Sequence, residues 1–192
     1  MQDTIEKALI NRLKKGDGEA LEEMYDLYAP VLLSMSMRYM SCREDAEDVV
    51  HDSFIKILKG IKKFKPQFEG AFEAWIKRIT VNTSINFLRK KAKMTGINGQ
   101  FHDVDTIPDP STQDIDLPEK MEPETAIKLI RELPAGYRTV LNLYVFERFS
   151  HKEIAEELDI SVNTSKSQLS KARALLRKKV IKMNKLQQKV ER

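Results

Sequence analysis

The sequence is poor in cysteine and in long apolar runs, and each of these two shortages excludes a class of protein or site. Cys42 is the only cysteine, so neither an internal disulfide nor a cysteine-bound metal cluster can form. No apolar run approaches the ~20 residues of a membrane-spanning helix, and 32% of the residues are charged. The N-terminal stretch Met1–Gly16 mixes acidic, basic and apolar side chains, unlike a secretory signal. We therefore expect a cytoplasmic protein without membrane insertion.

The residue sets of common enzymes and metal sites are missing as well. We find no Ser/His/Asp set and no glycine-rich phosphate loop of the GxxxxGK[ST] type. The three histidines, His51, His102 and His151, are scattered rather than placed at metal-ligand spacing, which predicts surface imidazoles. The sequence therefore predicts no catalytic residue, no metal and no cofactor.

Charge is distributed unevenly along the chain, although the formal net charge is only +4. The stretch Phe101–Glu122 is acidic, with Lys120 as its only basic side chain against Asp103, Asp105, Asp109, Asp114, Asp116, Glu119 and Glu122. Between Ile160 and Val190 no residue is acidic, and the basic ones are Lys166, Lys171, Arg173, Arg177, Lys178, Lys179, Lys182, Lys185 and Lys189. An acidic linker and a basic helix indicate separate modules, with the basic one facing a polyanion.

Apolar residues in the first module, 1–94, recur at the spacing of α-helices. A first helical face carries Leu21, Met24, Tyr25, Tyr28, Leu32 and Met35. Ser41 and Glu44 form a capping-box pattern before a second helix, whose buried face should be Ala46, Val49, Val50, Phe54, Ile57 and Ile61. After the break at Phe64–Gly70, a third helix is expected at Ala71–Lys91, with Phe72, Ile76, Ile79 and Thr83 on one side.

The second module, 123–192, shows four helical patterns in close succession. We expect helices at Glu124–Leu133, at Ala135–Phe146, from a second capping box at Ser150–Glu153, and after Ile160 to the basic end. No segment alternates apolar and polar residues long enough for a strand. Residues 95–122 contain proline, glycine and aspartate with little to bury. The prediction is an all-α protein of two small helical domains joined by a flexible acidic linker.

The segment His151–Arg173 has the organisation of a helix-turn-helix. A helix is followed by a short turn at Leu158–Ile160 and by a second helix that opens at Ser161. Amide and ammonium groups suit base edges, and hydroxyls suit phosphates, so we expect an outward face formed by Asn163, Thr164, Lys166, Ser167, Gln168, Ser170 and Lys171. The alternative is a plain helical hairpin with a solvated basic face.

The second module resembles the C-terminal DNA-binding domain of bacterial sigma factors. The matching segments are Glu132–Arg138, Ser150–Ser161 and Thr164–Arg173. The resemblance implies recognition of the minus-thirty-five promoter element by Asn163, Thr164, Lys166, Ser167, Gln168, Ser170, Lys171, Arg173 and Arg177. Asp159 occupies a place where the family commonly has glycine, Ser165 one where it has a buried valine or isoleucine, and Gln168 one where arginine is frequent.

Two segments of the first module resemble the same family. Arg43–Ile57 is similar to its polymerase-binding helix, which implies a docking role for Glu44, Asp45, Asp48, Asp52 and Phe54. Glu44, Asp48 and Asp52 share one helical face by their four-residue spacing. The alternative there is a solvated acidic face with a weak Asp52–Lys56 pair.

Phe72–Lys91 is similar to the family segment that melts the promoter and recognises the minus-ten element. The resemblance implies DNA-binding roles for Lys65, Gln67, Trp75, Arg78, Asn82, Asn86 and Arg89. By analogy, the loop Lys65–Gly70 and Asn82 form a pocket for an unstacked base. The alternative for Trp75 is an ordinary core tryptophan.

Both modules together resemble the compact extracytoplasmic-function subfamily of the sigma-70 family. The resemblance implies a transcription initiation factor that binds core RNA polymerase, the upstream duplex and the opened strand of promoter DNA, and an anti-sigma factor. The competing hypothesis is a stand-alone helix-turn-helix regulator. Such a regulator needs a dimer interface or a sensor domain, and the sequence contains no heptad repeat or ligand motif for either.

Overall fold

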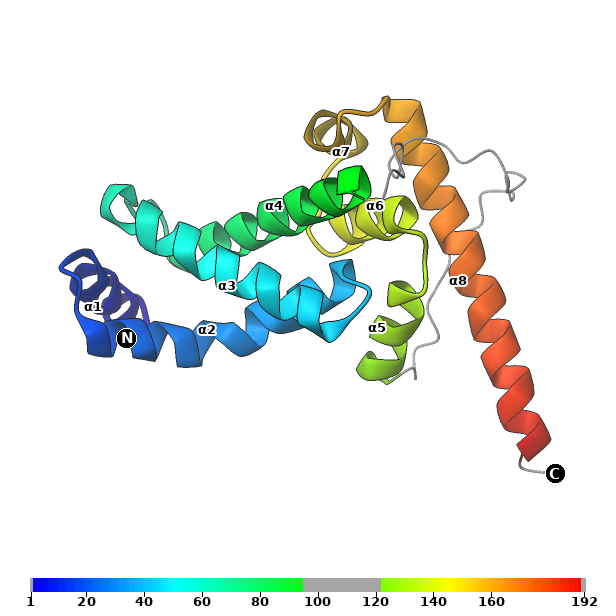
Figure 1. Cartoon of the computed structure of the whole chain (residues 1–192), viewed down its shortest axis with the longest axis horizontal. Helices are drawn as coiled ribbons and strands as arrows, with labels where there is room; N and C mark the ends of the chain where they lie inside the picture. The colour runs from blue at the N-terminus through cyan, green and yellow to red at the C-terminus, as the bar shows by residue number, and fades with distance from the viewer. Residues whose placement is uncertain (1, 95–121, 191–192) are drawn as a thin grey trace. The chain divides into compact units, whose positions relative to one another are not determined.

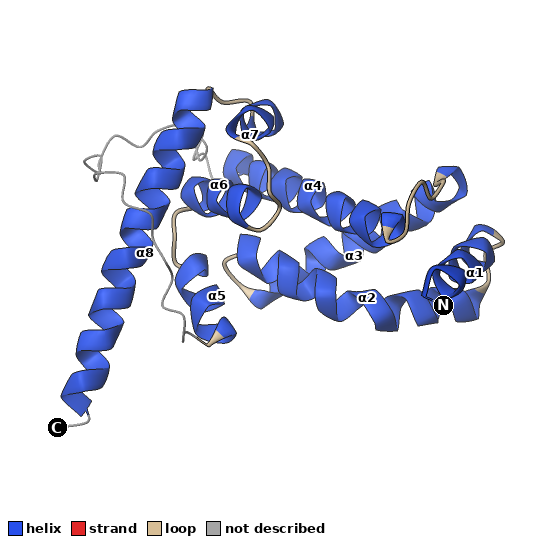
Figure 2. Cartoon of the chain, turned by 180° about the vertical axis from the view of Figure 1, so that it is seen from behind, coloured by secondary structure: helices blue, strands red, loops and turns tan. Residues whose placement is uncertain are grey.

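The computed structural model describes residues 2–94 and 122–190, and every regular element within these two ranges is helical (Figure 1; Figure 2). The chain divides into two compact units, Met1–Phe87 and Leu88–Arg192. The division falls inside the third predicted helix. Nearly all of the predicted acidic linker, residues 95–121, lies outside the described residues.

The first unit contains three complete α-helices and the larger part of a fourth, which continues past the end of the unit at Phe87. They are α1 (Gln2–Lys14), α2 (Gly18–Tyr39), α3 (Arg43–Gly60) and α4 (Ala71–Met94), with a short 3-10 turn, η1, at Ile61–Lys63. Asp17 caps α2 by accepting hydrogen bonds from the backbone N–H groups of Glu19 and Ala20. Arg12 of α1 forms a salt bridge with Asp17 (2.8 Å), and this guanidinium lowers the pKa of the Asp17 carboxyl group.

The predicted buried face of α3 is confirmed, because all six of its residues from Ala46 to Ile61 are buried. The apolar face of α2 is only partly covered, because Met24 is fully buried whereas Leu21 and Tyr25 are exposed. The N-cap of α3 is Cys42, without a side-chain capping bond, one residue after the cap predicted at Ser41.

The second unit contains the other four helices: α5 (Pro123–Arg131), α6 (Ala135–Val145), α7 (His151–Leu158) and α8 (Val162–Val190). The helix α8 packs against α5, α6 and α7. Its predicted inward residues are confirmed as buried: Leu169, Ala172, Leu176 and Val180. The buried Arg138 of α6 donates to the carbonyl oxygen of Arg131 (2.5 Å), and so satisfies a backbone acceptor at the end of α5.

The capping box at the start of α7 is present as predicted. The Ser150 hydroxyl accepts from the Glu153 backbone N–H, and the Glu153 carboxylate accepts from the Ser150 backbone N–H (2.8 Å). These contacts satisfy two backbone donors at the end where the helix has no internal partners for them.

We expect Ser150→Ala to lower the free energy of unfolding of the second unit by about 1 kcal/mol, because one helix-capping acceptor is lost. Urea unfolding followed by circular dichroism measures the change. Ser34→Ala, which removes an exposed hydroxyl inside α2, is the matched control and should leave the midpoint within experimental error. Equal midpoints for the two variants would contradict this role of the cap.

Candidate functional site

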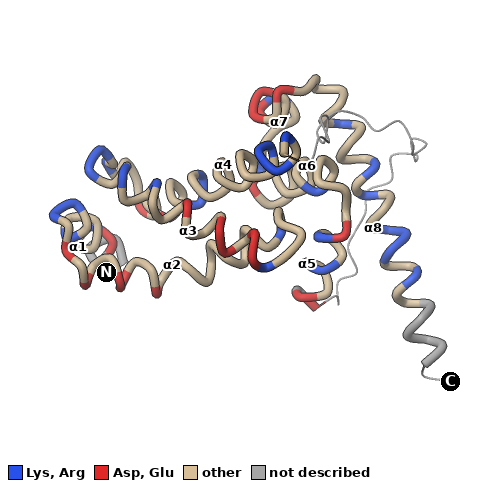
Figure 3. The backbone as a smooth tube through the Cα atoms, viewed as in Figure 1, with Lys and Arg blue, Asp and Glu red and all other residues tan. Residues whose placement is uncertain are grey.

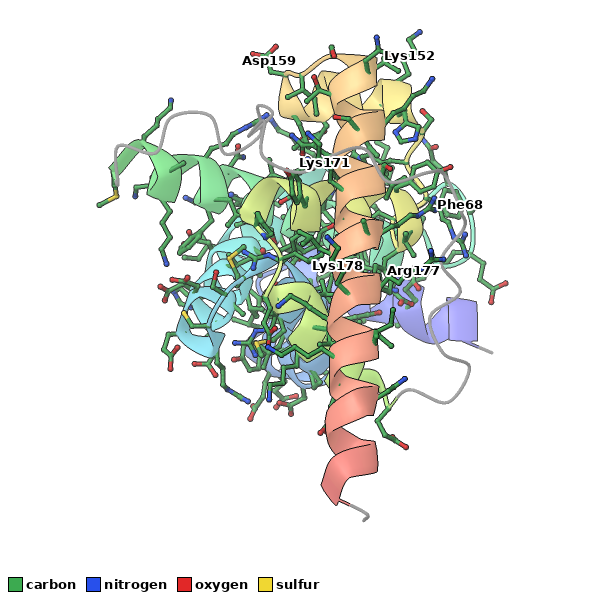
Figure 4. All side chains as sticks on the ribbon, turned by 90° about the vertical axis from the view of Figure 1, so that its right-hand side faces the viewer. Phe68, Lys152, Asp159, Lys171, Arg177 and Lys178 are labelled. Atoms are coloured by element: carbon green, nitrogen blue, oxygen red, sulfur yellow. The ribbon has the colours of Figure 1, made fainter. Side chains whose placement is uncertain are left out.

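The turn between α7 and α8 has the geometry that a helix-turn-helix requires. Asp159 adopts a left-handed backbone conformation (φ 56°, ψ 49°), which aspartate tolerates better than most residues. Ser161 directly precedes α8, and its hydroxyl accepts from the Thr164 backbone N–H at 2.9 Å. Figure 4 shows Asp159 at this turn, between α7 and the start of α8. The predicted fold of His151–Arg173 is therefore confirmed.

The start of α8 does not expose all nine residues that the sequence predicted for DNA contact. Asn163, Lys166 and Arg177 are exposed, and Thr164, Ser167, Ser170 and Arg173 are partly exposed. The outward prediction is wrong for Gln168 and Lys171, which expose only 1% and 8% of their surface. Both lie on the side of the helix that also carries the buried residues Ser165 and Ala172.

Ser165 is buried, and it is joined to α7 by a polar contact. A hydrogen bond of 2.9 Å links its hydroxyl to Nδ1 of His151. The His151 ring stacks on Tyr144 of α6, with the ring centres 4.7 Å apart. Burial lowers the pKa of His151, and the positive charges of Lys166 and Arg173 lower it further. His151 therefore connects α7 to α6 and α8, and it is only partly exposed rather than the free surface imidazole that the sequence predicted.

Arg173 and Arg177 extend the basic side of α8 beyond its first turns. The guanidinium carbon of Arg173 lies 5.8 Å from the centre of the Tyr144 ring, close enough for a cation–π contact. Arg177 and Lys178 come from the middle of the helix (Figure 4) and are exposed. Lys179 instead forms a salt bridge with Glu132 (2.5 Å), which lowers the pKa of that carboxyl group. The helix thus carries exposed positive charge over several turns.

The loop between η1 and α4 exposes every side chain from Lys65 to Glu69. It contains the two predicted contact residues Lys65 and Gln67. It also contains Phe68, which exposes 64% of its surface and which the sequence analysis did not select. The signal for Phe68 was present in the sequence, because an aromatic residue between Pro66 and Gly70 has no helical face on which to be buried. Figure 3 shows basic residues gathered where α3 leads into this loop.

Trp75 belongs to an aromatic cluster in the first unit. Its ring stacks on Phe64 with the centres 4.6 Å apart, and it also contacts Phe72 at 5.9 Å. The far edge of the indole faces Gly60, where an added Cβ would lie only 2.9 Å from Trp75 Cζ2. The Trp75 side chain is partly buried and packs in this cluster, whereas the Phe68 ring is largely exposed.

The four other predicted minus-ten residues follow α4 at spacings of three and four. Arg78 and Asn86 are exposed, and Asn82 and Arg89 are partly exposed. Residues at these spacings share one side of a helix. The structure therefore offers amide and guanidinium groups along one side of α4.

A groove of about 640 Å³ separates α2 and α3 in the first unit. Its lining combines apolar side chains with charged ones at the rim, and consists of Tyr25, Asp26, Ala29, Pro30, Leu33, Arg43, Glu47, Asp48, Val50 and His51. Arg43 and Glu47 form a salt bridge with each other (2.7 Å). No described residue forms an ion pair with Asp48. Figure 3 shows the acidic residues along α3.

The predicted docking residues of α3 divide into two groups. Glu44, Asp48 and Asp52 are exposed, and Asp45 is partly exposed. Phe54 exposes only 5% of its surface and packs against Tyr25, with the ring centres 4.9 Å apart. Phe54 therefore supports Tyr25, a lining residue of the groove, from its buried side, and a docking role for Phe54 stays a prediction.

Within the described ranges, 2–94 and 122–190, none of the helices has the length and apolar character of a membrane span. The same ranges contain no group of three or more His, Cys, Asp or Glu residues arranged to hold a metal ion.

Comparison with known proteins connects these surfaces to a family. The family model of sigma-70 region 2 matches residues 24–94, and that of sigma-70 region 4 matches residues 124–176. The ECF RNA polymerase sigma-E factor of Haemophilus influenzae is 30% identical over 186 residues, which cover 91% of this chain and 95% of the relative. The chain belongs to the extracytoplasmic-function sigma factors.

One further relative agrees with this assignment. The ECF RNA polymerase sigma factor SigW of Bacillus subtilis is 28% identical, and the alignment covers 91% of this sigma factor and 96% of SigW. The solved structure of CnrH in complex with the cytosolic domain of CnrY matches with a TM-score of 0.48 and 20% identity, over 94% of this chain and 97% of that one.

The sigma factor therefore directs promoter-specific transcription, and the alternative of a stand-alone regulator is not favoured. Region 2 covers the groove, the exposed loop and α4, and region 4 covers the helix-turn-helix.

Proposed function

We propose that the sigma factor binds core RNA polymerase through the groove between α2 and α3. The observation that carries this proposal is the composition of the groove, whose lining combines the apolar residues Ala29, Leu33 and Val50 with acidic ones that include Asp48. Pro30, which also lines the groove, has no backbone N–H, so the helical hydrogen bond to the carbonyl of Asp26 is not made. Such a surface fits an amphipathic partner helix with basic or amide side chains.

The N-terminal part of α8 is proposed to read the minus-thirty-five element in the major groove. Asn163 and Lys166 are exposed at the end of the helix that a helix-turn-helix inserts. Thr164, Ser167, Ser170 and Arg173 add partly exposed groups beside them, and Arg177 adds a positive charge one turn later. The buried Gln168 and Lys171 are left out of this contact surface.

The loop Lys65–Gly70 and one side of α4 are proposed to hold the opened minus-ten strand. Phe68 offers an exposed ring on which a base can stack, and Lys65 and Gln67 lie beside it in the loop. Arg78, Asn82, Asn86 and Arg89 continue the polar surface along α4. A base held there cannot restack, so the open state of the promoter is stabilised.

A protein with these two partners works in the bacterial cytoplasm, without catalysis of its own. An anti-sigma factor that covers the α2–α3 groove would hold it inactive, because core polymerase needs the same surface. A pull-down tests the assignment. The sigma factor should retain core polymerase in the absence of DNA, whereas a stand-alone regulator would bind promoter DNA unaided and leave core polymerase in the flow-through.

Lys166→Ala should weaken promoter binding by the holoenzyme and lower the slope of log affinity against log salt by about 0.9, because one phosphate contact is lost. Fluorescence anisotropy with a labelled promoter, repeated over a range of potassium chloride concentrations, measures the slope. Lys128→Ala on α5 removes an exposed lysine away from the recognition helix and should keep the original slope. An unaltered slope in Lys166→Ala would remove this residue from the phosphate contacts.

A further inference from the structure

The helix α1 contacts the chain on both sides of the exposed loop Lys65–Gly70. On the incoming side, Nζ of Lys14 donates to the carbonyl oxygen of Phe64 at 2.6 Å. On the outgoing side, the backbone N–H of Phe72 donates to Oε1 of Glu6 at 3.3 Å. Only residues 65–71 lie between these two anchor points. In Figure 1, α1 lies at the end of the first unit where α3 turns into α4.

Each of the two α1 side chains forms a hydrogen bond with a backbone group at the end of another helix, where that group has no partner within its own helix. Phe72 is the second residue of α4, and the first N–H groups of a helix have no acceptor within it. A carboxylate at that end is further favoured by the helix dipole. Phe64 ends η1, so its carbonyl oxygen likewise receives a donor from outside, namely Lys14.

The body of α1 is fixed independently of these two polar contacts. Leu9, Ile10 and Leu13 are buried, and α1 packs against α2 and η1. Beside the Glu6 anchor, Tyr28 of α2 meets the Phe72 ring edge-on at 5.6 Å. Burial raises the pKa of the Tyr28 hydroxyl, and the negative charges of Glu6 and Glu73 raise it further. The two anchors are therefore held on a rigid support, while the side chains from Lys65 to Glu69 remain exposed.

We propose that α1 positions the base-holding loop, with Lys14 and Glu6 as positioning residues for capture of the opened strand. This inference rests on the proposed role of the loop in minus-ten recognition. A loop held at both ends loses less conformational freedom when a base binds. The affinity for the opened strand is therefore higher without any additional contact between the protein and DNA. The family model of region 2 begins at residue 24, and α1 lies before it.

The test uses holoenzyme reconstituted from core polymerase and the full-length chain. The probe is a labelled single-stranded oligonucleotide of the minus-ten element of a promoter that the holoenzyme uses. Each position in turn is made abasic, and affinities are measured by anisotropy. In the wild type, one abasic position should weaken binding by about tenfold or more, because a stacked and hydrogen-bonded base is lost.

Lys14→Met removes the ammonium donor and Glu6→Met removes the carboxylate acceptor, while each keeps a side chain of similar length. In both variants the affinity for the intact oligonucleotide should fall about fivefold to tenfold, because a charge-assisted hydrogen bond that orders the loop is lost. The affinity for the abasic probe should stay near that of the wild type. Matched controls are Lys15→Met, which removes an exposed lysine next to the anchor, and Glu6→Gln, which keeps an acceptor oxygen. Lys15→Met should behave as the wild type, and Glu6→Gln, which loses the charge but keeps the acceptor, should lie between the wild type and Glu6→Met.

The ratio of intact to abasic affinity separates positioning from a general loss of structure, since misfolding lowers both affinities together. A ratio that stays at the wild-type value in Lys14→Met and in Glu6→Met would overturn the positioning role of α1. If the wild-type holoenzyme shows no sensitive position at all, the loop does not hold a base, and it is the proposed function of the loop that fails.

Discussion

Asp48→Arg is expected to lower the affinity for core polymerase by about 100-fold or more and to abolish transcription in vitro. Asp48 lies on the rim of the α2–α3 groove, and no described residue neutralises its charge. Replacing it by arginine places a positive charge against a basic partner, and such like-charge contacts cost several kcal/mol in an interface. Binding is measured by titrating labelled sigma factor with core polymerase. The exposed position predicts an unchanged circular dichroism spectrum and melting temperature.

Two further variants make this result specific. Asp48→Asn keeps the shape and loses the charge, so its affinity should lie between that of the wild type and that of Asp48→Arg. Glu156→Arg is an equal charge reversal at an exposed site on α7, outside the groove, and should bind core polymerase normally. Normal binding of Asp48→Arg would show that the polymerase docks on another surface.

Phe68→Ala should weaken the binding of the opened promoter strand by the holoenzyme by about 5-fold to 100-fold. The estimate corresponds to the loss of about 1–3 kcal/mol when one base loses its aromatic stacking partner. Because the Phe68 ring is largely exposed, the free energy of unfolding should stay the same. The measurement is equilibrium binding to a promoter with a pre-melted minus-ten element, together with permanganate reactivity of its thymines on duplex templates.

Trp75→Ala is the informative comparison, because the two aromatic residues have different surroundings. The indole of Trp75 is stacked on Phe64 and packed against Gly60, so its removal should destabilise the first unit by about 3 kcal/mol. If Phe68→Ala binds the opened strand normally while a folded Trp75 variant does not, the stacking residue is Trp75 and the assignment of Phe68 is wrong.

Helix positions and inward faces could be predicted from the sequence because apolar spacing reports them directly. The buried stripe of α3, the inward residues of α8 and the Ser150 capping box all follow from residue types a few positions apart. The helix-turn-helix was predicted in the same way. Asp159 also fits the predicted turn, because its left-handed backbone conformation depends on the residue type at that one position.

Features that depend on tertiary packing escaped the sequence analysis. Gln168 is polar, and polarity favoured an outward position, but the position of α8 against α6 and α7 turns it inward. Ser165 stands where the family has a buried valine or isoleucine, and it forms a hydrogen bond with His151, fourteen residues away in the chain. The contacts of Lys14 and Glu6 with Phe64 and Phe72 join residues at least fifty positions apart, and no periodicity reports such pairs.

Transcription from a random promoter library with purified core polymerase tests the central claim most directly. Core polymerase with the wild-type sigma factor should enrich templates that share two elements at a fixed spacing, and core polymerase with Asp48→Arg should enrich none. In this account, the subunit reads promoters only when polymerase is docked in the α2–α3 groove. Enrichment of the same templates by the sigma factor alone would contradict it, and so would enrichment by Asp48→Arg as strong as that by the wild type.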